Sequence, residues 1–299
     1  MAVLDFFCWR EVFILAGPRF LKVEFFNVGQ GDSAFIETPQ GHQILIDGGP
    51  DPTVLSKLNS LMPFWDKEID VVILTHPEKD HMAGILDVLQ RYKVDYFLWT
   101  GVVKNDAENK KLSELLDKIS QPRNNFFAAL VGFLSRDKKP TITKIINVSA
   151  GTKIKAGNAK MDILYPSENL AGKEMKDTSN DTCVVSKLIY GKDSFLFTGD
   201  ISSSAEKNLA KIVGGRSAHN LRADVLKVAH HGSKYSTSEL FLQNVQPEYA
   251  VISVGKNSYG HPTPEVLQRL DKYGIKTLIT DQSGDIEFVS DGQNIKIIN

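Results

Sequence analysis

Short apolar runs and amphipathic segments alternate along most of this chain. From residue 21 onward, runs rich in Val, Ile and Phe are bounded by Gly, Pro or Asp, and between many of them apolar residues recur every three or four positions. Such runs predict buried strands, and such spacing predicts helices that pack by one face. In the first half the predicted strands are 21–28, 33–38, 43–49, 71–75 and 94–99, and the predicted helices are 53–62 and 82–92.

The second half repeats this alternation. Its predicted strands are 160–166, 182–191, 193–200, 224–229 and 249–255, and its predicted helices are 203–213, 238–245 and 263–274. The last segments, 276–280, 285–290 and 293–299, are separated by turn residues and predict a β-meander that closes a sheet edge. Two sheets, each covered by helices, are expected. The predicted fold class is therefore α/β, a four-layer αββα sandwich.

The organisation along the chain predicts one main domain over residues 21–299, since no repeat or low-complexity linker interrupts it. Residues 1–20 contain a short apolar piece preceded by Asp5 and not by basic residues. This favours an N-terminal leader or a packed segment over a secretion signal. Residues 105–139 are charged and in part helical, which is typical of a substrate lid or of a plain helical cover.

The composition is that of a soluble globular chain. Lys and Arg number 35 against 36 Asp and Glu, so the overall basic charge of a general nucleic-acid binder is excluded, although a local basic groove is not. No stretch approaches the roughly 18 apolar residues of a membrane span. The two cysteines, Cys8 and Cys183, form no CxxC pair, which favours a reducing compartment, and we expect a cytoplasmic protein.

Histidines and aspartates follow several of the predicted strands directly. Because strand ends display side chains at the edge of a sheet, these groups would share one pocket if the strands pack side by side. Imidazole and carboxylate groups in one pocket are typical ligands of a transition metal. The richest segment stands directly after the strand 71–75 and contains four ligand-type residues, His76, Glu78, Asp80 and His81.

The other strand-end residues allow two interpretations each. Asp200 either bridges metals or caps the helix that follows it. His230 and His231 are adjacent, so only one of them is expected to face the pocket. Asp47 is either a ligand or the hydrogen-bond partner that orients a ligating histidine.

Four further residues complete the set of candidates. His261 precedes Pro262, which would hold its loop stiff. Asn180 and Asp181 either donate oxygen ligands or form a turn. Asp32 either belongs to the tight turn that its neighbouring glycines allow, or faces the metals from the opposite sheet.

Several of these motifs resemble one known family. The segment THPEKDHMAGI, residues 75–85, resembles the HxHxDH motif of the metallo-β-lactamase superfamily, and FLFTGD, which ends at Asp200, resembles its later bridging aspartate. The ordered series that includes FFNVGQGDSAFIETPQGHQILIDGG, VLKVAHHGSKYSTSELFL and AVISVGKNSYGHPTPEVLQRL is similar to the hydrolase domain of the ComEC family of competence proteins, from about residue 21 to the C-terminus. The resemblance implies the αββα fold and hydrolysis of esters, amides, thioesters or phosphodiesters with one or two divalent ions, Zn²⁺ or Mn²⁺.

The resemblance also implies roles for individual residues. His76 and residue 78 would hold one metal, and Asp80 and His81 would hold the other, with Asp200 between them. Position 78 carries Glu where the motif has His, which makes that site harder and favours Mn²⁺. The expected metal ligands are His76, Glu78, Asp80, His81, Asp181, Asp200, His230, His231 and His261, and the expected orienting residues are Asp32, Asp47 and Asn180.

Together these features predict a metal-dependent hydrolase, a phosphodiesterase or nuclease that acts on a phosphodiester or nucleic-acid substrate through a metal-activated water. Asp80 would orient this water, and His231, Lys234 or Tyr235 would stabilise the leaving oxygen. Two alternatives remain at this point. One is a hydrolase of small esters or lactones on the same fold. The other is a non-catalytic, metal-free interaction module, which the Glu at position 78 keeps open.

Overall fold

The computed structural model describes residues 20–121, 142–175, 179–214 and 221–298. The predicted leader, residues 1–20, lies outside the described residues apart from Phe20, and so does the part of the predicted helical cover beyond residue 121. The clearest piece of that cover is helix α4 (Ala107–Ser120), whose N-terminus is capped by the side chain of Asp106. Within the described residues, no helix combines the length and the apolar character that crossing a membrane requires.

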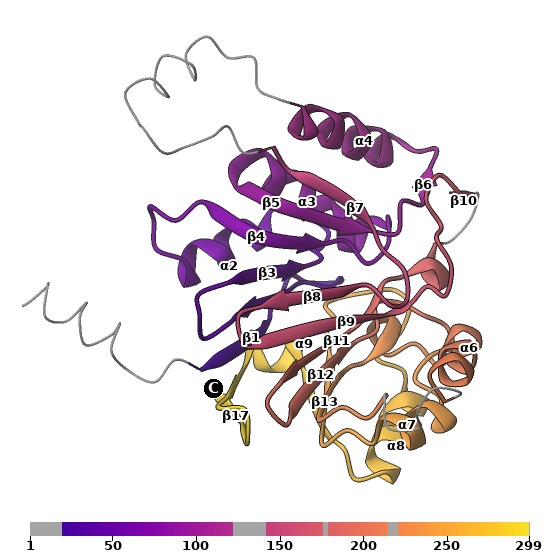
Figure 1. The fold of residues 1–299 in the computed structure, drawn as a ribbon. Coiled ribbons are helices and arrows are strands. Elements are labelled where there is room, and N and C mark those ends of the chain that lie inside the picture. The colour runs from indigo at the N-terminus through magenta and orange to yellow at the C-terminus, as the bar shows by residue number, and fades with distance from the viewer. Residues whose placement is uncertain (1–19, 122–141, 176–178, 215–220, 299) are drawn as a thin grey trace, which may run out of the picture.

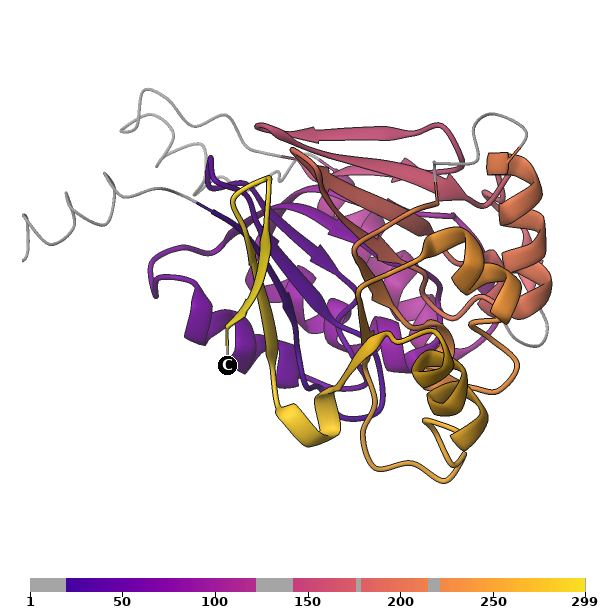
Figure 2. The same ribbon diagram turned by 90° about the horizontal axis from the view of Figure 1, so that it is seen from below.

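Two sheets stack face to face, and each is covered on its outer side by helices (Figures 1 and 2). The first sheet has the order β17-β16-β1-β2-β3-β4-β5-β7. Its strands are β1 (Leu21–Phe25), β2 (Ala34–Glu37), β3 (Gln43–Ile46), β4 (Glu68–Ile73), β5 (Lys93–Trp99), β7 (Lys144–Asn147), β16 (Ile286–Ser290) and β17 (Ile295–Ile298). Its helices are α2 (Thr53–Leu61), α3 (Lys79–Arg91) and α4.

The second sheet has the order β15-β14-β13-β12-β11-β9-β8. Its strands are β8 (Lys153–Ala156), β9 (Ala159–Tyr165), β11 (Val185–Tyr190), β12 (Asp193–Phe197), β13 (Val225–Lys227), β14 (Tyr249–Ile252) and β15 (Lys276–Ile279). Its helices are α6 (Ser203–Gly214), α7 (Glu239–Val245) and α8 (Pro264–Lys272). The smaller elements are the parallel pair β6 (Val103–Lys104) and β10 (Glu174–Met175), the short helix α9 (Thr280–Ser283), and the 3₁₀ turns η1 (Asn180–Thr182) and η2 (Ala229–Gly232).

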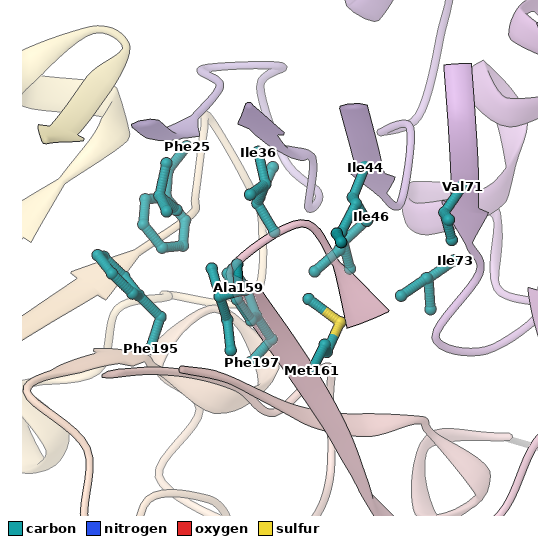
Figure 3. Packing of buried hydrophobic residues seen from close by; sticks show 14 of the residues in the cluster. Phe25, Ile36, Ile44, Ile46, Val71, Ile73, Ala159, Met161, Phe195 and Phe197 are labelled. Atoms are coloured by element: carbon teal, nitrogen blue, oxygen red, sulfur yellow. The ribbon is translucent and has the colours of Figure 1, made fainter. Parts of the chain in front are cut away.

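Three apolar layers separate the four structural layers. The central layer lies between the sheets, where Phe25 and Ile36 of the first sheet face Phe195 and Phe197 of the second (Figure 3). The rings of Phe25 and Phe197 stack with their centroids 5.7 Å apart. A second apolar layer lies under α2, α3 and α4, and a third lies under α6, α7 and α8. The predicted αββα sandwich is therefore confirmed, and burial of these three layers is the main force that holds it together.

The C-terminal segments depart from the predicted meander. Strand β15 lies parallel to β14 at the edge of the second sheet, whereas the hairpin of β16 and β17 crosses to the first sheet and pairs with β1. The prediction of one meander was therefore wrong. Turn signals locate strand ends, but they do not tell which sheet a strand joins, because the two sheets here bury similar apolar faces.

Candidate metal centre

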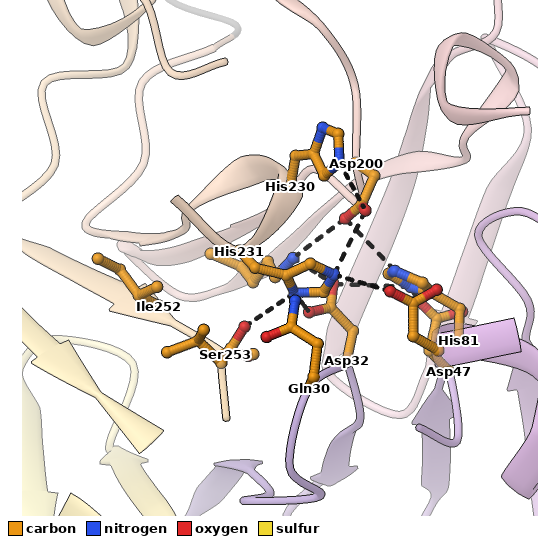
Figure 4. Close-up of polar contacts among 12 residues, drawn as sticks. Gln30, Asp32, Asp47, His81, Asp200, His230, His231, Ile252 and Ser253 are labelled. Atoms are coloured by element: carbon orange, nitrogen blue, oxygen red, sulfur yellow. Dashed lines mark hydrogen bonds and ion pairs between the residues drawn. The ribbon is translucent and has the colours of Figure 1, made fainter. Parts of the chain in front are cut away.

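Four buried side chains from four separate segments of the chain meet at one edge of the sandwich. We call them the buried cluster. One possible ligand atom from each lies within 4.8 Å of all the others. The members of the cluster are Asp32, His81, Asp200 and His231. Figure 4 shows them converging from both sheets. The loop before β2 and the first turn of α3 supply two of them, and the loops after β12 and β13 supply the other two.

The ring of His81 is oriented by a carboxylate behind it. Nδ1 of His81 lies 2.8 Å from Oδ2 of Asp47, and the Thr75 hydroxyl donates to the same oxygen at 2.7 Å. A carboxylate can only accept hydrogen bonds, so Nδ1 carries a proton and Nε2 is the ring nitrogen that would bind a metal ion. Nε2 of His81 points to Oδ1 of Asp200 at 3.4 Å. Asp47 is therefore placed to orient a ligand, as in many metal sites.

His231 is oriented in the same way by a backbone carbonyl. Its Nδ1 donates to the carbonyl oxygen of Ser253 at 2.8 Å, which leaves Nε2 as the nitrogen that would bind a metal ion. This Nε2 lies 3.3 Å from Oδ2 of Asp80 and 3.4 Å from Oδ2 of Asp200. The backbone of His231 has a left-handed φ of 53°, and that of His230 has a φ of 51°. Two consecutive non-glycine residues in this conformation are uncommon, and such strain is concentrated at functional sites.

Burial and charge act against each other on the ionisable groups of the cluster. Burial by itself would lower the pKa of His81 and His231, but the nearby carboxylates, Asp200 first, hold both values well above the ordinary 6.5. Burial would raise the pKa of Asp200, yet His231 and His81 hold it well below 3.8. The carboxylates thus attract positive charge strongly, and bound protons supply that charge when no cation is present.

The spacing of these atoms fits a divalent ion. Two ligands that each lie about 2.0–2.1 Å from a tetrahedral zinc ion are about 3.3–3.4 Å from one another. The distances from Nε2 of His231 to Asp80 and Asp200, and from Nε2 of His81 to Asp200, are 3.3, 3.4 and 3.4 Å. Two imidazole nitrogens with two carboxylates suit either Zn²⁺ or Mn²⁺. The residues present therefore fit the metal that the donor set implies.

A buried lysine that sequence reasoning missed completes the site. The ammonium group of Lys227 forms an ion pair with Asp32, lies 3.8 Å from Oδ1 of Asp200 and donates to the carbonyl of Gly199 at 3.3 Å. Burial would lower the pKa of Lys227, but Asp32 and Asp200 raise it above 10.5, so the group stays charged. A signal was present, because Lys227 ends a strand whose other residues are apolar.

Three of the predicted histidines lie around the cluster without joining it. The ring of His76 is 4.2 Å from that of His81, and burial lowers its pKa to about 3, so it is neutral. Its Nε2 has no hydrogen-bond partner among the residues that the structure describes. Nε2 of His230 lies 3.9 Å from Asp200, and His261 lies farther out, with its ring centroid 5.6 Å from that of His230.

Two predicted ligands, Glu78 and Asp181, are not among the members of the buried cluster. The carboxylate of Glu78 accepts two hydrogen bonds of 2.8 Å from Lys104 and two more from the backbone and hydroxyl of Ser179. Asp181 is exposed and accepts from the backbone and hydroxyl of Ser202, just before α6. In this structure both carboxylates are thus hydrogen-bonded to groups outside the buried cluster.

The two remaining candidates lie at the margin of the site. The side-chain nitrogen of Asn180, which begins the 3₁₀ turn η1, is 3.4 Å from Nε2 of His230. Lys234 is exposed, and its ammonium lies 5.3 Å from the ring centre of Tyr235. Lys234 follows the 3₁₀ turn η2, which contains His231.

Close backbone packing fixes the helix that carries Asp80 and His81. The backbone N–H of Gly48 donates to the carbonyl of His81 at 2.8 Å, and the N–H of Gly84 donates to Gly49 at 3.0 Å. A Cβ atom added to Gly84 would lie 2.0 Å from the carbonyl oxygen of Gly48. Glycine at position 84 therefore lets α3 approach the loop that holds Asp47, and this contact sets the position of the helix N-terminus.

The chain resembles known proteins in sequence. A family model described as the beta-lactamase superfamily domain matches residues 42–215. ComE operon protein 3 of Bacillus subtilis is 31% identical over 89% of this chain, and competence protein ComA of Neisseria gonorrhoeae is 28% identical over 89%. Recombination protein 2 of Haemophilus influenzae is 27% identical over 89%. The matched regions are 33%, 32% and 28% of these relatives, so the chain spans about a third of their length.

Solved structures share the same fold. The metallo-beta-lactamase fold protein YhfI from Bacillus subtilis aligns with a TM-score of 0.52 and 14% identity, over 89% of this chain and 99% of that protein. Igni18, a metallo hydrolase from Ignicoccus hospitalis, aligns with a TM-score of 0.51 and 15% identity, over 89% of this chain and 98% of that protein. At such low identity these alignments establish the fold alone.

Proposed function

This chain belongs to the metallo-β-lactamase superfamily, and we propose that it is a divalent-metal-dependent phosphodiesterase that acts on nucleic acid. The observation that carries the proposal is the arrangement of His81, Asp200 and His231. Both imidazoles point Nε2 at one buried carboxylate at 3.4 Å. Each ring is held from behind, one by Asp47 and the other by the carbonyl of Ser253. A pocket built only for stability would not require this orientation.

Asp80, His81, Asp200 and His231 are the residues that would hold the ion. A bound divalent ion supplies Lewis acidity and lowers the pKa of water toward neutrality. Asp80 is the member of this set that reaches solvent, with 35% of its side chain exposed. In this proposal Asp80 accepts a hydrogen bond from the attacking water and orients that water toward a substrate at the rim. The side chains of His81 and His231 are buried, and in this proposal they serve only to hold the ion.

A phosphodiester substrate is favoured by charge and by the relatives. The site offers hard carboxylate ligands, and the divalent ions that such ligands hold suit phosphate oxygens. Lys234 is exposed beside the site, where it would contact a phosphate of the substrate. Two relatives are named for competence and one for recombination. These names fit a nucleic-acid substrate better than a small ester.

Metal analysis and hydrolysis assays test the proposal together. The purified protein, stripped with EDTA and reloaded with Mn²⁺ or Zn²⁺, should bind the ion in stoichiometric amount and cleave single-stranded DNA and bis(p-nitrophenyl) phosphate. Asp200→Asn and Asp80→Asn should each lower kcat by at least about 100-fold, because each removes a charged oxygen ligand. Asp95→Asn, on the outer part of β5, serves as the control and should retain activity.

The outcomes distinguish the alternatives. Stoichiometric metal with cleavage of p-nitrophenyl acetate or a lactone, but of no phosphodiester, would favour the small-ester hydrolase. A protein that binds neither Mn²⁺ nor Zn²⁺ would favour the non-catalytic interaction module. Full phosphodiesterase activity in both Asp variants would contradict the assignment of the site.

A further inference from the structure

A row of aromatic rings runs from the buried cluster to the protein surface. The ring of His231 is 6.2 Å from that of His230, His230 is 5.6 Å from His261, and His261 is 5.7 Å from Tyr259. Exposure increases along the row. His231 is buried, whereas Tyr259 at the outer end is 73% exposed. The row thus connects the candidate metal centre to an aromatic face that is open to solvent.

The loop that carries Tyr259 is built around one side chain. The amide nitrogen of Asn257 donates to the carbonyls of Gly255 and His261 at 2.8 Å each. The amide oxygen of Asn257 accepts from the backbone N–H groups of Tyr259 and His261 at 3.0 Å each. Four hydrogen bonds close this turn, so the exposed position of Tyr259 is fixed by the loop. An aromatic ring held in water on a fixed loop contributes little to the core, and this suggests a role in binding.

A second exposed aromatic residue lies on the adjoining loop. The loops after β13 and β14 contact each other, since the N–H of Thr263 donates to the carbonyl of Gly232 at 2.9 Å. The loop after β13 exposes Tyr235, of which 67% is accessible, next to the exposed Lys234. The loop after β14 exposes Lys256 near Tyr259. Aromatic rings interleaved with lysines are typical of surfaces that bind single-stranded nucleic acid.

We propose that Tyr259 is the stacking platform for a nucleobase next to the scissile phosphodiester, with Tyr235 as a second platform and Lys234 and Lys256 as phosphate contacts. The inference rests on the proposed phosphodiesterase function and names single strands as its substrate. Bases in a duplex are stacked on each other, so an exposed tyrosine favours unpaired bases. Tyr259 acts in substrate binding, outside the set of residues that hold the ion.

The test compares Tyr259→Ala and Tyr259→Trp with the wild-type chain on two oligonucleotides. One is oligo(dT), and the other has the same backbone with abasic sites in place of the bases. Loss of one stacking contact is worth about 1–3 kcal/mol, or roughly 5- to 150-fold. Tyr259→Ala should raise KM for oligo(dT) by at least about 5-fold with little change in kcat, and Tyr259→Trp should restore it. The KM for the abasic strand should be the same in all three proteins.

A binding measurement separates failure of this inference from failure of the proposed function. A single strand that contains 2-aminopurine is titrated with protein in EDTA and again with Mn²⁺, since stacking on an aromatic ring quenches its fluorescence. Quenching by the wild-type chain and by Tyr259→Trp, but not by Tyr259→Ala, supports the platform even if no cleavage is observed. Phe64→Ala removes an aromatic side chain that is 82% exposed and lies just before the start of β4. This variant should leave quenching unchanged. Equal quenching by wild type and Tyr259→Ala, or none by the wild type in either buffer, would overturn the inference.

Discussion

The Oδ2 atom of Asp47 lies 2.8 Å from Nδ1 of His81, and this contact determines which ring nitrogen faces Asp200. Asp47 sits in a left-handed conformation with a φ of 58°, directly after β3. Burial raises the pKa of Asp47, while His81 opposes that rise. The pair therefore depends on mutual hydrogen bonding and on the hydroxyl of Thr75, which also donates to Asp47.

Asp47→Asn should weaken metal binding. An amide in place of the carboxylate no longer fixes the proton on Nδ1 of His81. In part of the molecules the proton then sits on Nε2, which can no longer bind the metal ion. We expect the Kd for Mn²⁺ or Zn²⁺ to rise about 10- to 100-fold, as is usual when such an orienting group is removed. Isothermal titration of the stripped protein measures this change. Asp95→Asn is the control, and an unchanged Kd in Asp47→Asn would show that the contact does not support metal binding.

Lys227→Met should act in opposite directions on stability and on metal binding. Removing the ammonium leaves buried Asp32 without its ion-pair partner, which should lower the free energy of unfolding in EDTA by about 3 kcal/mol. The same loss leaves more uncompensated negative charge, so saturating Mn²⁺ should raise Tm by more than it does in the wild type. Differential scanning calorimetry with and without metal measures both effects.

Lys187→Met is the matched control for this change. Lys187 is also buried, but it lies on β11 and donates to the carbonyl of Arg222, away from the buried cluster. This variant is expected to lose stability without any gain in the metal-induced shift. The same gain in both variants would exclude a specific role for Lys227 at the site.

Gly84→Ala should destabilise the protein, although alanine normally stabilises a helix relative to glycine by roughly 0.5–1 kcal/mol. The added Cβ would lie 2.0 Å from the carbonyl oxygen of Gly48, so α3 or the loop after β3 must shift. We expect the free energy of unfolding to fall by about 1–3 kcal/mol, together with weaker metal binding. Urea unfolding measures the first effect. Gln90→Ala, at an exposed position near the end of α3, should have little effect, and a stabilised Gly84→Ala would contradict the close packing.

Glu24 lies outside the buried cluster and should make the stability of the protein depend on pH. It lies opposite Glu287 in the pairing of β1 with β16, and burial together with Glu287 raises its pKa from 4.5 to about 7. A carboxyl with a raised folded-state pKa costs no stability below about pH 4.5, and its cost grows as the pH rises from there and is complete above about 7. Because the group is partly exposed, solvent screening limits this cost to the order of 1 kcal/mol.

Glu24→Gln should therefore be more stable than the wild type at pH 8 and equally stable at pH 4.5. Urea unfolding at the two pH values measures the difference. Glu37→Gln, at the end of the neighbouring β2, is the control. A constant difference between Glu24→Gln and the wild type across this pH range would show that the carboxyl does not titrate in this way.

The alternation of apolar runs with amphipathic segments was sufficient to predict the layers of the fold, because each strand and helix carries its own periodicity. Strand ends also indicated where the chemistry lies, and Asp200 and His231 meet from loops after two different strands. The roles of Glu78 and Asp181 were not predictable in this way. Their partners, Lys104 and Ser202, lie in segments whose positions follow only from the tertiary structure.

Two further features of the site could not be predicted from the sequence, for the same reason. Lys227 ends a buried strand, and only the neighbouring loops show that its ammonium is neutralised by Asp32. From the sequence, either His230 or His231 could face the pocket. The structure orients His231 because the carbonyl of Ser253, on the adjacent strand, is within 2.8 Å of its Nδ1.

The pairing of β1 with β16 has a consequence for biosynthesis. During translation, β1 leaves the ribosome before the other strands of the two sheets, and its partner on that side follows only after most of the domain has been made. Until then one backbone edge of β1 has no neighbour, and nascent chains with such open edges are prone to wrong pairing. Association with a chaperone on the growing polypeptide would shield this edge until the final hairpin arrives.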